Sequence, residues 1–180
     1  GKAAEKVQNC SMELGGNAPF IVLEDADVDL AIDSAFVAKI RNAGESCVSA
    51  NRFFVHSSVY EEFASGFTAR MAALKVGPGL DDGVDVGPLV NASTRDKVKQ
   101  LVDEAVSMGA TIRTGGKCPS DVGYFYEPTV LDNIPQGAEI LTTEIFGPVA
   151  ALVSFDDVDE MVKNANDTHL GLAAYVISGN

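Results

Sequence analysis

Residues 17–23, Asn-Ala-Pro-Phe-Ile-Val-Leu, establish the fold class together with the helix and strand patterns that come after them. This short apolar run contains β-branched residues, which predicts a buried strand. Asp25 or Asp27 can cap the helix that comes next, and this helix is expected to end at residues 42–44, Asn-Ala-Gly. Its apolar residues recur every four positions on one face: Val28, Ile32, Phe36 and Ile40. Residues 52–56 then predict a second strand.

The rest of the chain continues to alternate between helices and strands. Ser58 to Glu61 is typical of a capping box, and the apolar stripe of the helix it opens is Tyr60, Phe63, Phe67, Met71 and Leu74. A third helix is expected from Ser93 to a stop at Gly109, with Val98, Leu101, Val102, Ala105 and Met108 facing inward. Further strands are predicted at residues 111–113, 125–131, 149–155 and 173–178, and a short helix at 156–167. This alternation predicts an α/β fold, a three-layer α/β/α sandwich with a mostly parallel sheet.

The Gly/Pro/Asp-rich connection at residues 77–91 superficially resembles a dinucleotide-binding loop. The dinucleotide fingerprint requires G-x-G-x-x-G directly after a strand. Here the spacing is one residue too long and the segment follows a helix, so we reject that interpretation.

Composition and charge exclude several classes of function. The chain of 180 residues is 46% apolar, enough for a core of its own, and its net charge is −13. Such a surface repels polyanions, which argues against nucleic acids and anionic membranes as partners. No apolar run approaches the roughly 20 residues that span a bilayer. The three cysteines show no metal-binding spacing, so no metal is expected, and they indicate a reducing, cytoplasmic location.

Cys47 is the first candidate for chemistry, because it interrupts apolar sequence in a loop of small and polar residues. Thiolate is a strong nucleophile, and a cysteine at a helix start would have its thiolate favoured by amide groups and the helix dipole. Its backbone N–H could also stabilise a developing oxyanion. A buried structural cysteine is the alternative on this residue alone.

Two further segments carry candidate residues. Glu13 precedes Leu14, Gly15 and Gly16, and partial desolvation there would raise its pKa towards that of a useful base, although a surface glutamate is the alternative. The string Glu-Ile-Phe-Gly-Pro occupies residues 144–148 and could also be a turn at a strand edge.

Taken together, these three segments resemble the aldehyde dehydrogenase superfamily, most closely its succinate-semialdehyde dehydrogenase branch. The resemblance implies that Cys47 is the catalytic nucleophile and Glu13 the base that activates the hydrolytic water. It places Leu14, Gly15 and Gly16 where the nicotinamide ring packs, and glycine fits there because a Cβ at those two positions would collide with the cofactor. It implies that Glu144 binds the nicotinamide ribose and that Phe146 packs on the same region of NAD or NADP.

The resemblance also implies a substrate. In the semialdehyde branch an arginine six residues before the nucleophile binds the distal carboxylate, and Arg41 matches that position. Its alternative is a helix-terminal arginine that interacts with the dipole. The implied reaction oxidises an aldehyde through a cysteine thiohemiacetal and a thioester, most closely succinate semialdehyde to succinate. Glutarate semialdehyde or a non-carboxylated aldehyde remain alternatives.

The chain departs from the usual Gly-Gln-Thr-Cys-Val-Cys string at two positions. Glu45 adds a negative charge near the thiol, which would raise the pKa of Cys47, and Ser49 removes a second cysteine. Two other classes therefore stay open. A cofactor-free thiol hydrolase would pair Cys47 with His56 or His169, and a non-catalytic binding module would show no aldehyde chemistry.

The resemblance covers one lobe of a family enzyme. We therefore expect residues 1–180 to form a truncated, nucleophile-bearing catalytic domain, without the dinucleotide-binding and oligomerisation segments. We expect this chain to be inactive alone, and a full-length parent to be a homodimer or homotetramer. The sequence does not separate NAD from NADP.

Overall fold

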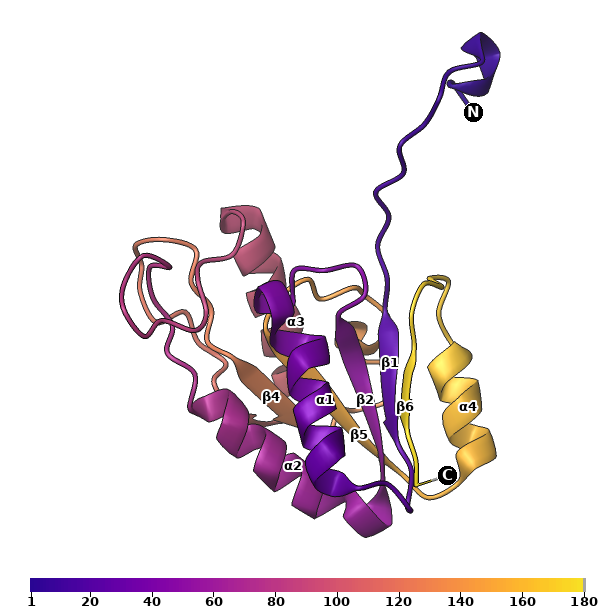
Figure 1. Ribbon diagram of the computed structural model, residues 1–180, viewed down its shortest axis with the longest axis vertical. Helices are drawn as coiled ribbons and strands as arrows, with labels where there is room; N and C mark the ends of the chain where they lie inside the picture. Colours follow the sequence, from indigo (N-terminus) through magenta and orange to yellow (C-terminus); the bar gives the residue numbers. More distant parts are fainter. Residues whose placement is uncertain (180) are drawn as a thin grey trace.

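A twisted six-stranded sheet forms the centre of the computed structural model, which describes residues 1–179 (Figure 1). The strand order is β3-β4-β5-β2-β1-β6. The strands are β1 (Ala18–Val22), β2 (Ala50–His56), β3 (Thr111–Thr114), β4 (Thr129–Asp132), β5 (Val149–Phe155) and β6 (Tyr175–Ile177). Every neighbouring pair is parallel except β3 and β4, which are antiparallel. The predicted mostly parallel α/β sheet is confirmed.

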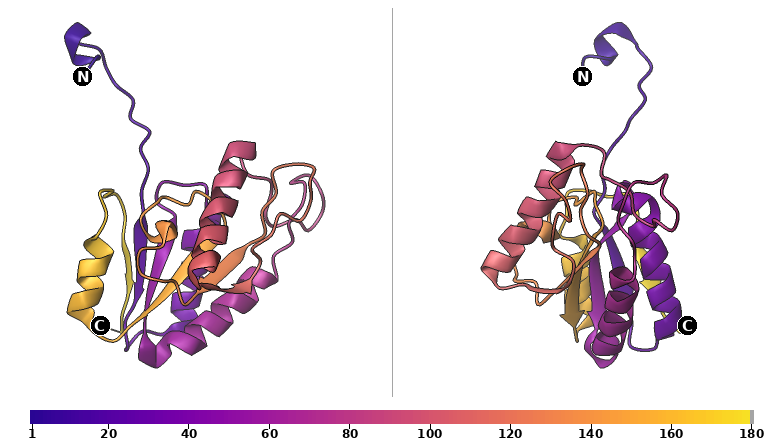
Figure 2. Two further views of the ribbon diagram at one scale, coloured as in Figure 1. Left: turned by 180° about the vertical axis from the view of Figure 1, so that it is seen from behind. Right: turned by 90° about the vertical axis from the view of Figure 1, so that its left-hand side faces the viewer.

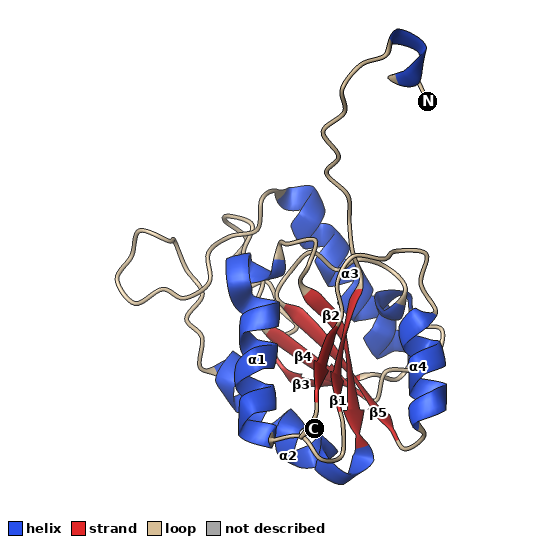
Figure 3. Cartoon of the chain, turned by 45° about the vertical axis from the view of Figure 1, so that its right-hand side comes forward, coloured by secondary structure: helices blue, strands red, loops and turns tan. Residues whose placement is uncertain are grey.

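Helices cover both faces of this sheet (Figures 2 and 3). The helices α1 (Val28–Ile40) and α2 (Ser57–Ala72) pack on one face, and α3 (Ala92–Met108) and α4 (Val158–Asn166) lie on the other. Three short 3-10 helices are η1 (Ala4–Lys6), η2 (Arg41–Gly44) and η3 (Glu139–Leu141). The three-layer α/β/α arrangement is therefore as predicted.

The central strands supply both faces of the core, because successive side chains of a strand point to opposite sides. On β1, Phe20 and Val22 join the cluster beneath α1 and α2, whereas Ile21 joins Met161 of α4. On β2, Phe53 likewise packs in the cluster beneath α1 and α2. Burial on both faces explains why these strands are continuous apolar runs in the sequence rather than alternating ones.

The helix α1 begins and ends where the sequence indicates. Of the two candidate caps, Asp27 is the N-cap, since its carboxylate accepts from the backbone N–H of Leu30 at 3.0 Å. After Ile40 the chain leaves the helix through Asn42 and Ala43, both with a φ of 54°. Such left-handed conformations end a helix abruptly.

Two helix starts differ from the prediction. The capping box at Ser58 is wrong: α2 begins at Ser57, and His56 is its N-cap, accepting from the Ser58 N–H at 3.3 Å. The strand β2 runs directly into α2, so the last residue of the strand, His56, is also the N-cap of the helix. Likewise α3 begins at Ala92 with Asn91 as its cap, rather than at Ser93.

Other differences concern packing and strand length. The side chains of Val98, Leu101, Val102 and Ala105 are buried as predicted, but Met108 is exposed at the end of α3. The strand predicted at residues 125–131 is present only as β4, which begins after Pro128 because proline cannot donate to a ladder. On α1 the most buried residues are Ala31, Ile32, Ala35 and Lys39.

The first residues extend from the body as an arm (Figures 1 and 2). This arm includes η1 and exposes Met12 and Leu14. Within residues 1–179, no helix is both long and apolar enough to cross a bilayer.

Candidate active site

The site lies at the amino-terminal edge of three adjacent strands. In the sheet β5, β2 and β1 are neighbours and run parallel. The segments that directly precede parallel neighbours necessarily converge at one edge. Residues 13–17 precede β1, residues 45–49 precede β2 and residues 144–148 precede β5. The fold thus gathers all three segments that carry candidate residues.

A cavity of about 420 Å³ lies where these segments meet. Its lining contains the predicted nucleophile, the predicted water-activating base and every residue predicted to contact the cofactor: Cys47, Glu13, Leu14, Gly15, Glu144 and Phe146, together with Glu45 and Ser46. Arg41 is the one predicted site residue that does not line it.

Glycines allow the segments to approach closely. A Cβ at Gly15 would lie 2.4 Å from the carboxylate of Glu144, and one at Gly16 would lie 2.1 Å from the carbonyl oxygen of Cys47. Both contacts are far inside van der Waals distance. At Gly16 the clash is with backbone, so the protein's own atoms require glycine there, whereas the Glu144 carboxylate beside Gly15 is the end of a flexible side chain and can shift.

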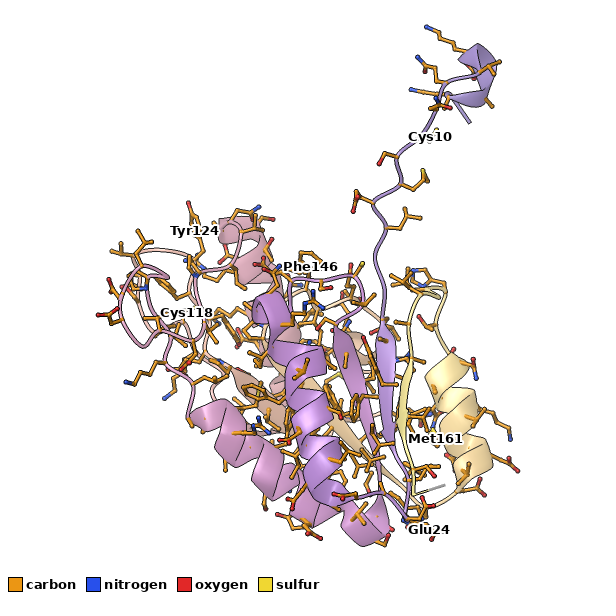
Figure 4. All side chains as sticks on the ribbon, in the orientation of Figure 1. Cys10, Glu24, Cys118, Tyr124, Phe146 and Met161 are labelled. Carbon is orange, nitrogen blue, oxygen red and sulfur yellow. The ribbon has the colours of Figure 1, made fainter. Side chains whose placement is uncertain are left out.

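The segment of Glu144 and Phe146 is held in place by backbone and side-chain contacts. The Glu144 carboxylate accepts from the Gly16 N–H at 3.1 Å, and the Glu144 carbonyl accepts from Lys97 Nζ at 3.1 Å. Phe146 has a φ of 57°, a left-handed conformation that is unfavourable for a residue with a bulky side chain. Its side chain lies at the end of the molecule from which the arm projects (Figure 4).

Cys47 lies in a turn between η2 and β2, so its predicted position at a helix start is wrong. The turn is closed by the Ser49 N–H, which donates to the Ser46 carbonyl at 3.0 Å. The thiol is half-buried and not in a disulfide. Because the chain continues from Cys47 into a strand, no helix dipole is available to favour its thiolate.

Glu45 has a hydrogen-bond partner outside the Cys47 loop. Its carboxylate accepts from the backbone N–H of Val90 at 3.0 Å, which ties the Cys47 loop to the segment that leads into α3. The residue that replaces the usual glutamine thus has a structural partner, although it also lines the cavity.

Glu13 is exposed at the base of the arm. The desolvation expected from its apolar neighbours is absent in this chain, because Met12 and Leu14 are themselves exposed. The structure therefore brings Glu13 to the cavity without burying its carboxylate.

Arg41 lies on a second, larger groove of about 740 Å³ between α1 and β6. Ser46 lines both this groove and the Cys47 cavity, so the Cys47 loop separates the two spaces. Ser49 lines the groove as well, and within residues 1–179 nothing hydrogen-bonds its buried hydroxyl. Arg41 and the residues on both sides of Cys47 therefore line the same groove.

Neither histidine lines the Cys47 cavity. His56 lies at the far end of β2 as the cap of α2, and His169 is exposed. The seven residues of β2 separate His56 from the site by roughly 20 Å at about 3.3 Å per residue. A dyad of Cys47 with His56 is thus ruled out by the fold.

Sequence reasoning missed Lys39, which is fully buried and donates to the Gly147 carbonyl at 3.2 Å. The signal was its spacing: Ala31, Ala35 and Lys39 follow one another at intervals of four, which places the lysine on the buried stripe of α1. Burial lowers the pKa of Lys39 to about 7, while the carboxylate of Glu144 acts in the opposite direction.

Comparison with known proteins points to one family. The profile of the aldehyde dehydrogenase family matches residues 1–180. A probable succinate-semialdehyde dehydrogenase [NADP(+)] of Sinorhizobium fredii is 48% identical, over 99% of this chain and 36% of that protein. A succinate-semialdehyde dehydrogenase of Paenarthrobacter nicotinovorans is 51% identical, over 98% of this chain and 39% of that protein. The chain thus spans less than two-fifths of the length of these curated relatives.

The fold agrees with a solved structure at similar identity. The crystal structure of succinate-semialdehyde dehydrogenase from Burkholderia pseudomallei matches with a TM-score of 0.95 and 44% identity, over 99% of this chain and 37% of that one. The match extends through the segments that form the Cys47 cavity. On these grounds the chain belongs to the aldehyde dehydrogenase family.

Proposed function

We propose that this chain is the nucleophile-bearing part of an NAD(P)-dependent dehydrogenase that oxidises succinate semialdehyde to succinate. The observation that carries the proposal is the single cavity shared by Cys47, Glu13 and Glu144, with Arg41 on the adjoining groove. The names of the relatives from Sinorhizobium fredii and Paenarthrobacter nicotinovorans support the same substrate.

In the proposed reaction the sulfur of Cys47 attacks the aldehyde carbon and forms a thiohemiacetal. When bound, the nicotinamide cofactor would supply the acceptor for the hydride that leaves this carbon, and the hydroxyl proton of the thiohemiacetal passes to solvent as the thioester carbonyl forms. The resulting thioester is attacked by a water whose proton passes to the Glu13 carboxylate. Cleavage of the carbon–sulfur bond then releases the carboxylate product and returns the Cys47 thiol.

The residues around the cavity suit a nicotinamide cofactor. The Glu144 carboxylate can exchange its contact with the Gly16 N–H for a ribose hydroxyl, and Phe146 offers an apolar surface beside it. Because Gly15 has no side chain, the space beside the Glu144 carboxylate stays open. NADP+ is favoured over NAD+ by the name of the Sinorhizobium fredii relative.

Arg41 is proposed to bind the distal carboxylate of the substrate. Its guanidinium is the cationic group on the groove of about 740 Å³, which otherwise exposes more apolar than polar surface. A guanidinium fork matches a carboxylate geometrically, and its positive charge offsets the overall charge of −13 that repels anions. Succinate semialdehyde and glutarate semialdehyde both present that carboxylate.

The experiment is turnover by the complete protein that carries this chain. We expect reduction of NADP+ or NAD+ with succinate semialdehyde at a higher kcat/KM than with glutarate semialdehyde or the uncharged butanal. Cys47→Ser should abolish turnover, whereas Cys118→Ser, at a thiol outside the cavity, should keep it. Equal efficiency with butanal would refute the carboxylated substrate, and cofactor-free ester hydrolysis as the main activity would favour the hydrolase alternative.

We further propose that the complete enzyme is a cytoplasmic homodimer or homotetramer without nucleic-acid or membrane partners. The net charge of −13 supports the lack of polyanionic partners, and the free thiols of the described cysteines support the cytoplasmic location, whereas the oligomeric state rests on the family resemblance alone. Light scattering after size-exclusion chromatography should give two or four times the monomer mass, and a monomer would contradict the proposal.

A further inference from the structure

Lys39 is an unusual residue for the interior of this fold. It is fully buried near the end of α1, and its Nζ donates to two acceptors at 3.2 Å, the Asn51 side chain on β2 and the Gly147 carbonyl. Burying an ammonium costs several kcal/mol unless hydrogen bonds and charges compensate. A leucine or methionine would fill the same space without that cost, so the retained lysine requires a reason.

The Gly147 carbonyl is the contact that links Lys39 to the active site. This oxygen also lies against Gly44, where a Cβ would be only 2.1 Å away. Gly147 directly follows Phe146, whose left-handed backbone is held against its own preference. Fixing the Gly147 carbonyl therefore restrains the backbone that aims the Phe146 ring at the cavity.

A chain of buried polar contacts extends from Lys39 to the other site segments. Asn51 accepts from Lys39 and donates to the Asn17 side chain at 3.2 Å, and Asn17 donates to the Leu141 carbonyl at 3.0 Å. Asn17 directly follows the Gly15-Gly16 pair. These hydrogen bonds thus connect two of the three cavity segments, those before β1 and β5, through Lys39 and Asn51 on β2.

The charges of Lys39 and Glu144 also link the buried lysine to the cavity. Burial lowers the pKa of Lys39 to about 7, and the charge on Glu144 raises it. The buried ammonium therefore interacts with the carboxylate proposed to bind the cofactor ribose. Among the described residues, Glu144 is the only charged group on the cavity wall that contributes to this shift.

We propose that Lys39 is a positioning residue for the cofactor side of the active site, which fixes Phe146 and Glu144 against the Cys47 loop through the Gly147 carbonyl. This inference rests on the proposed function, because the orientation of Glu144 and Phe146 matters for turnover only if they bind a cofactor. Lys39 itself contacts neither cofactor nor substrate.

The test compares three variants of the complete enzyme. Lys39→Met removes the donor, Lys39→Gln keeps an uncharged N–H donor, and Lys99→Met is the matched control at an exposed lysine paired with Asp103 on α3. Circular dichroism and thermal unfolding establish that each variant is folded. Calorimetric titration gives the Kd for NADP+, and steady-state kinetics gives the KM for the aldehyde.

We expect Lys39→Met to raise the Kd for NADP+ about tenfold or more when measured at pH 6, where the Lys39 ammonium is charged and the variant loses a charge-assisted hydrogen bond behind the binding residues. Lys39→Gln should raise it less, about threefold, because a donor to Gly147 remains. The aldehyde KM should stay within about twofold in both variants, and Lys99→Met should match the unchanged enzyme. A packing role alone would move the Kd and the KM together, and that result would overturn the proposal.

A second measurement needs neither cofactor nor substrate. Deuterium exchange of the peptide spanning residues 144–149 should become about tenfold faster in Lys39→Met, because its backbone loses a restraint, and should be unchanged in Lys99→Met. This result is expected even if the enzyme oxidises a different aldehyde, so it separates failure of the inference from failure of the proposed function. If Lys39→Met does not fold, Lys39→Gln carries the same comparison. Unchanged exchange in a folded Lys39 variant would overturn the proposal.

Discussion

The charge of Lys39 makes the stability of this protein depend on pH in a definite direction. The pKa of Lys39 is about 7 in the folded protein and near 10.5 when the chain is unfolded. Between these values the unfolded chain binds more protons, so the free energy of unfolding rises with pH. The cost of burying the charge is fully present below pH 7 and disappears as the pH rises from about 7 towards 10.5.

This linkage gives a prediction for Lys39→Met. Between pH 7 and 9 the free energy of unfolding of the unchanged protein should increase relative to that of Lys39→Met, by up to about 1 kcal/mol per pH unit. Urea unfolding at several pH values measures the difference. Lys99→Met is the control, since the pKa of Lys99 is raised by its hydrogen bond with Asp103 and it stays charged in this range. Parallel curves for the unchanged protein and Lys39→Met would contradict the prediction.

Arg41→Ala should impair carboxylated substrates selectively. Loss of a guanidinium–carboxylate contact is expected to lower kcat/KM for succinate semialdehyde about ten- to a hundredfold. Butanal should be oxidised with little change, because it has no carboxylate to bind. Arg95→Ala is a suitable control, since Arg95 pairs with Asp96 away from the groove. An equal loss on both aldehydes would mean that Arg41 supports the Cys47 loop rather than the substrate.

At the scale of elements, Arg52 connects β2 to α4 and to the start of β1. Its guanidinium donates to the carbonyls of Asn164 and Ala165 at the end of α4, each at 3.0 Å, and to the Asn17 carbonyl at 2.8 Å. A cation at a helix C-terminus is favoured by the exposed carbonyls there. A single buried side chain therefore docks α4 on the sheet beside the segment that leads into the site.

Arg52→Met should therefore destabilise the protein by about 2–4 kcal/mol, because three carbonyls lose their donor while the apolar packing is retained. Denaturant unfolding measures the loss. Deuterium exchange should be faster in residues 158–166 than in α1, since α4 loses its anchor. Arg95→Met, at a partly exposed arginine, serves as the control, and a loss below about 1 kcal/mol for Arg52→Met would refute this role.

For the whole molecule, we predict that the 180-residue chain folds cooperatively but does not reduce NAD+ or NADP+ with succinate semialdehyde. The sheet with helices on both faces provides a core, whereas the cavity of about 420 Å³ offers Glu144 and Phe146 for one part of the cofactor only. No dinucleotide fingerprint occurs in the sequence to hold the pyrophosphate. Urea unfolding should give one transition. No absorbance of reduced nicotinamide should develop, with the complete enzyme as positive control. Robust turnover by the chain alone would contradict this prediction.

The α/β class and the order of helices and strands could be predicted from the amino-acid sequence, which also singled out the three segments proposed to carry chemistry. This was possible because apolar runs, caps and glycines are local signals: the run at residues 17–23 became β1, and the stop before Gly44 ended α1. Two element boundaries were predicted wrongly although the deciding residues are local. His56 rather than Ser58 caps α2, because β2 runs directly into this helix, and β4 begins only after Pro128.

How the segments meet depends on tertiary structure alone. Strand order and direction are set by long-range pairing, so no local pattern could show that β5, β2 and β1 are parallel neighbours with their preceding loops at one edge. Nor could it show that Glu13 is exposed. The burial of Lys39 depends on Asn51 and Gly147, which are distant in sequence, because the free energy of a buried charge is fixed by the acceptors that the fold places around it.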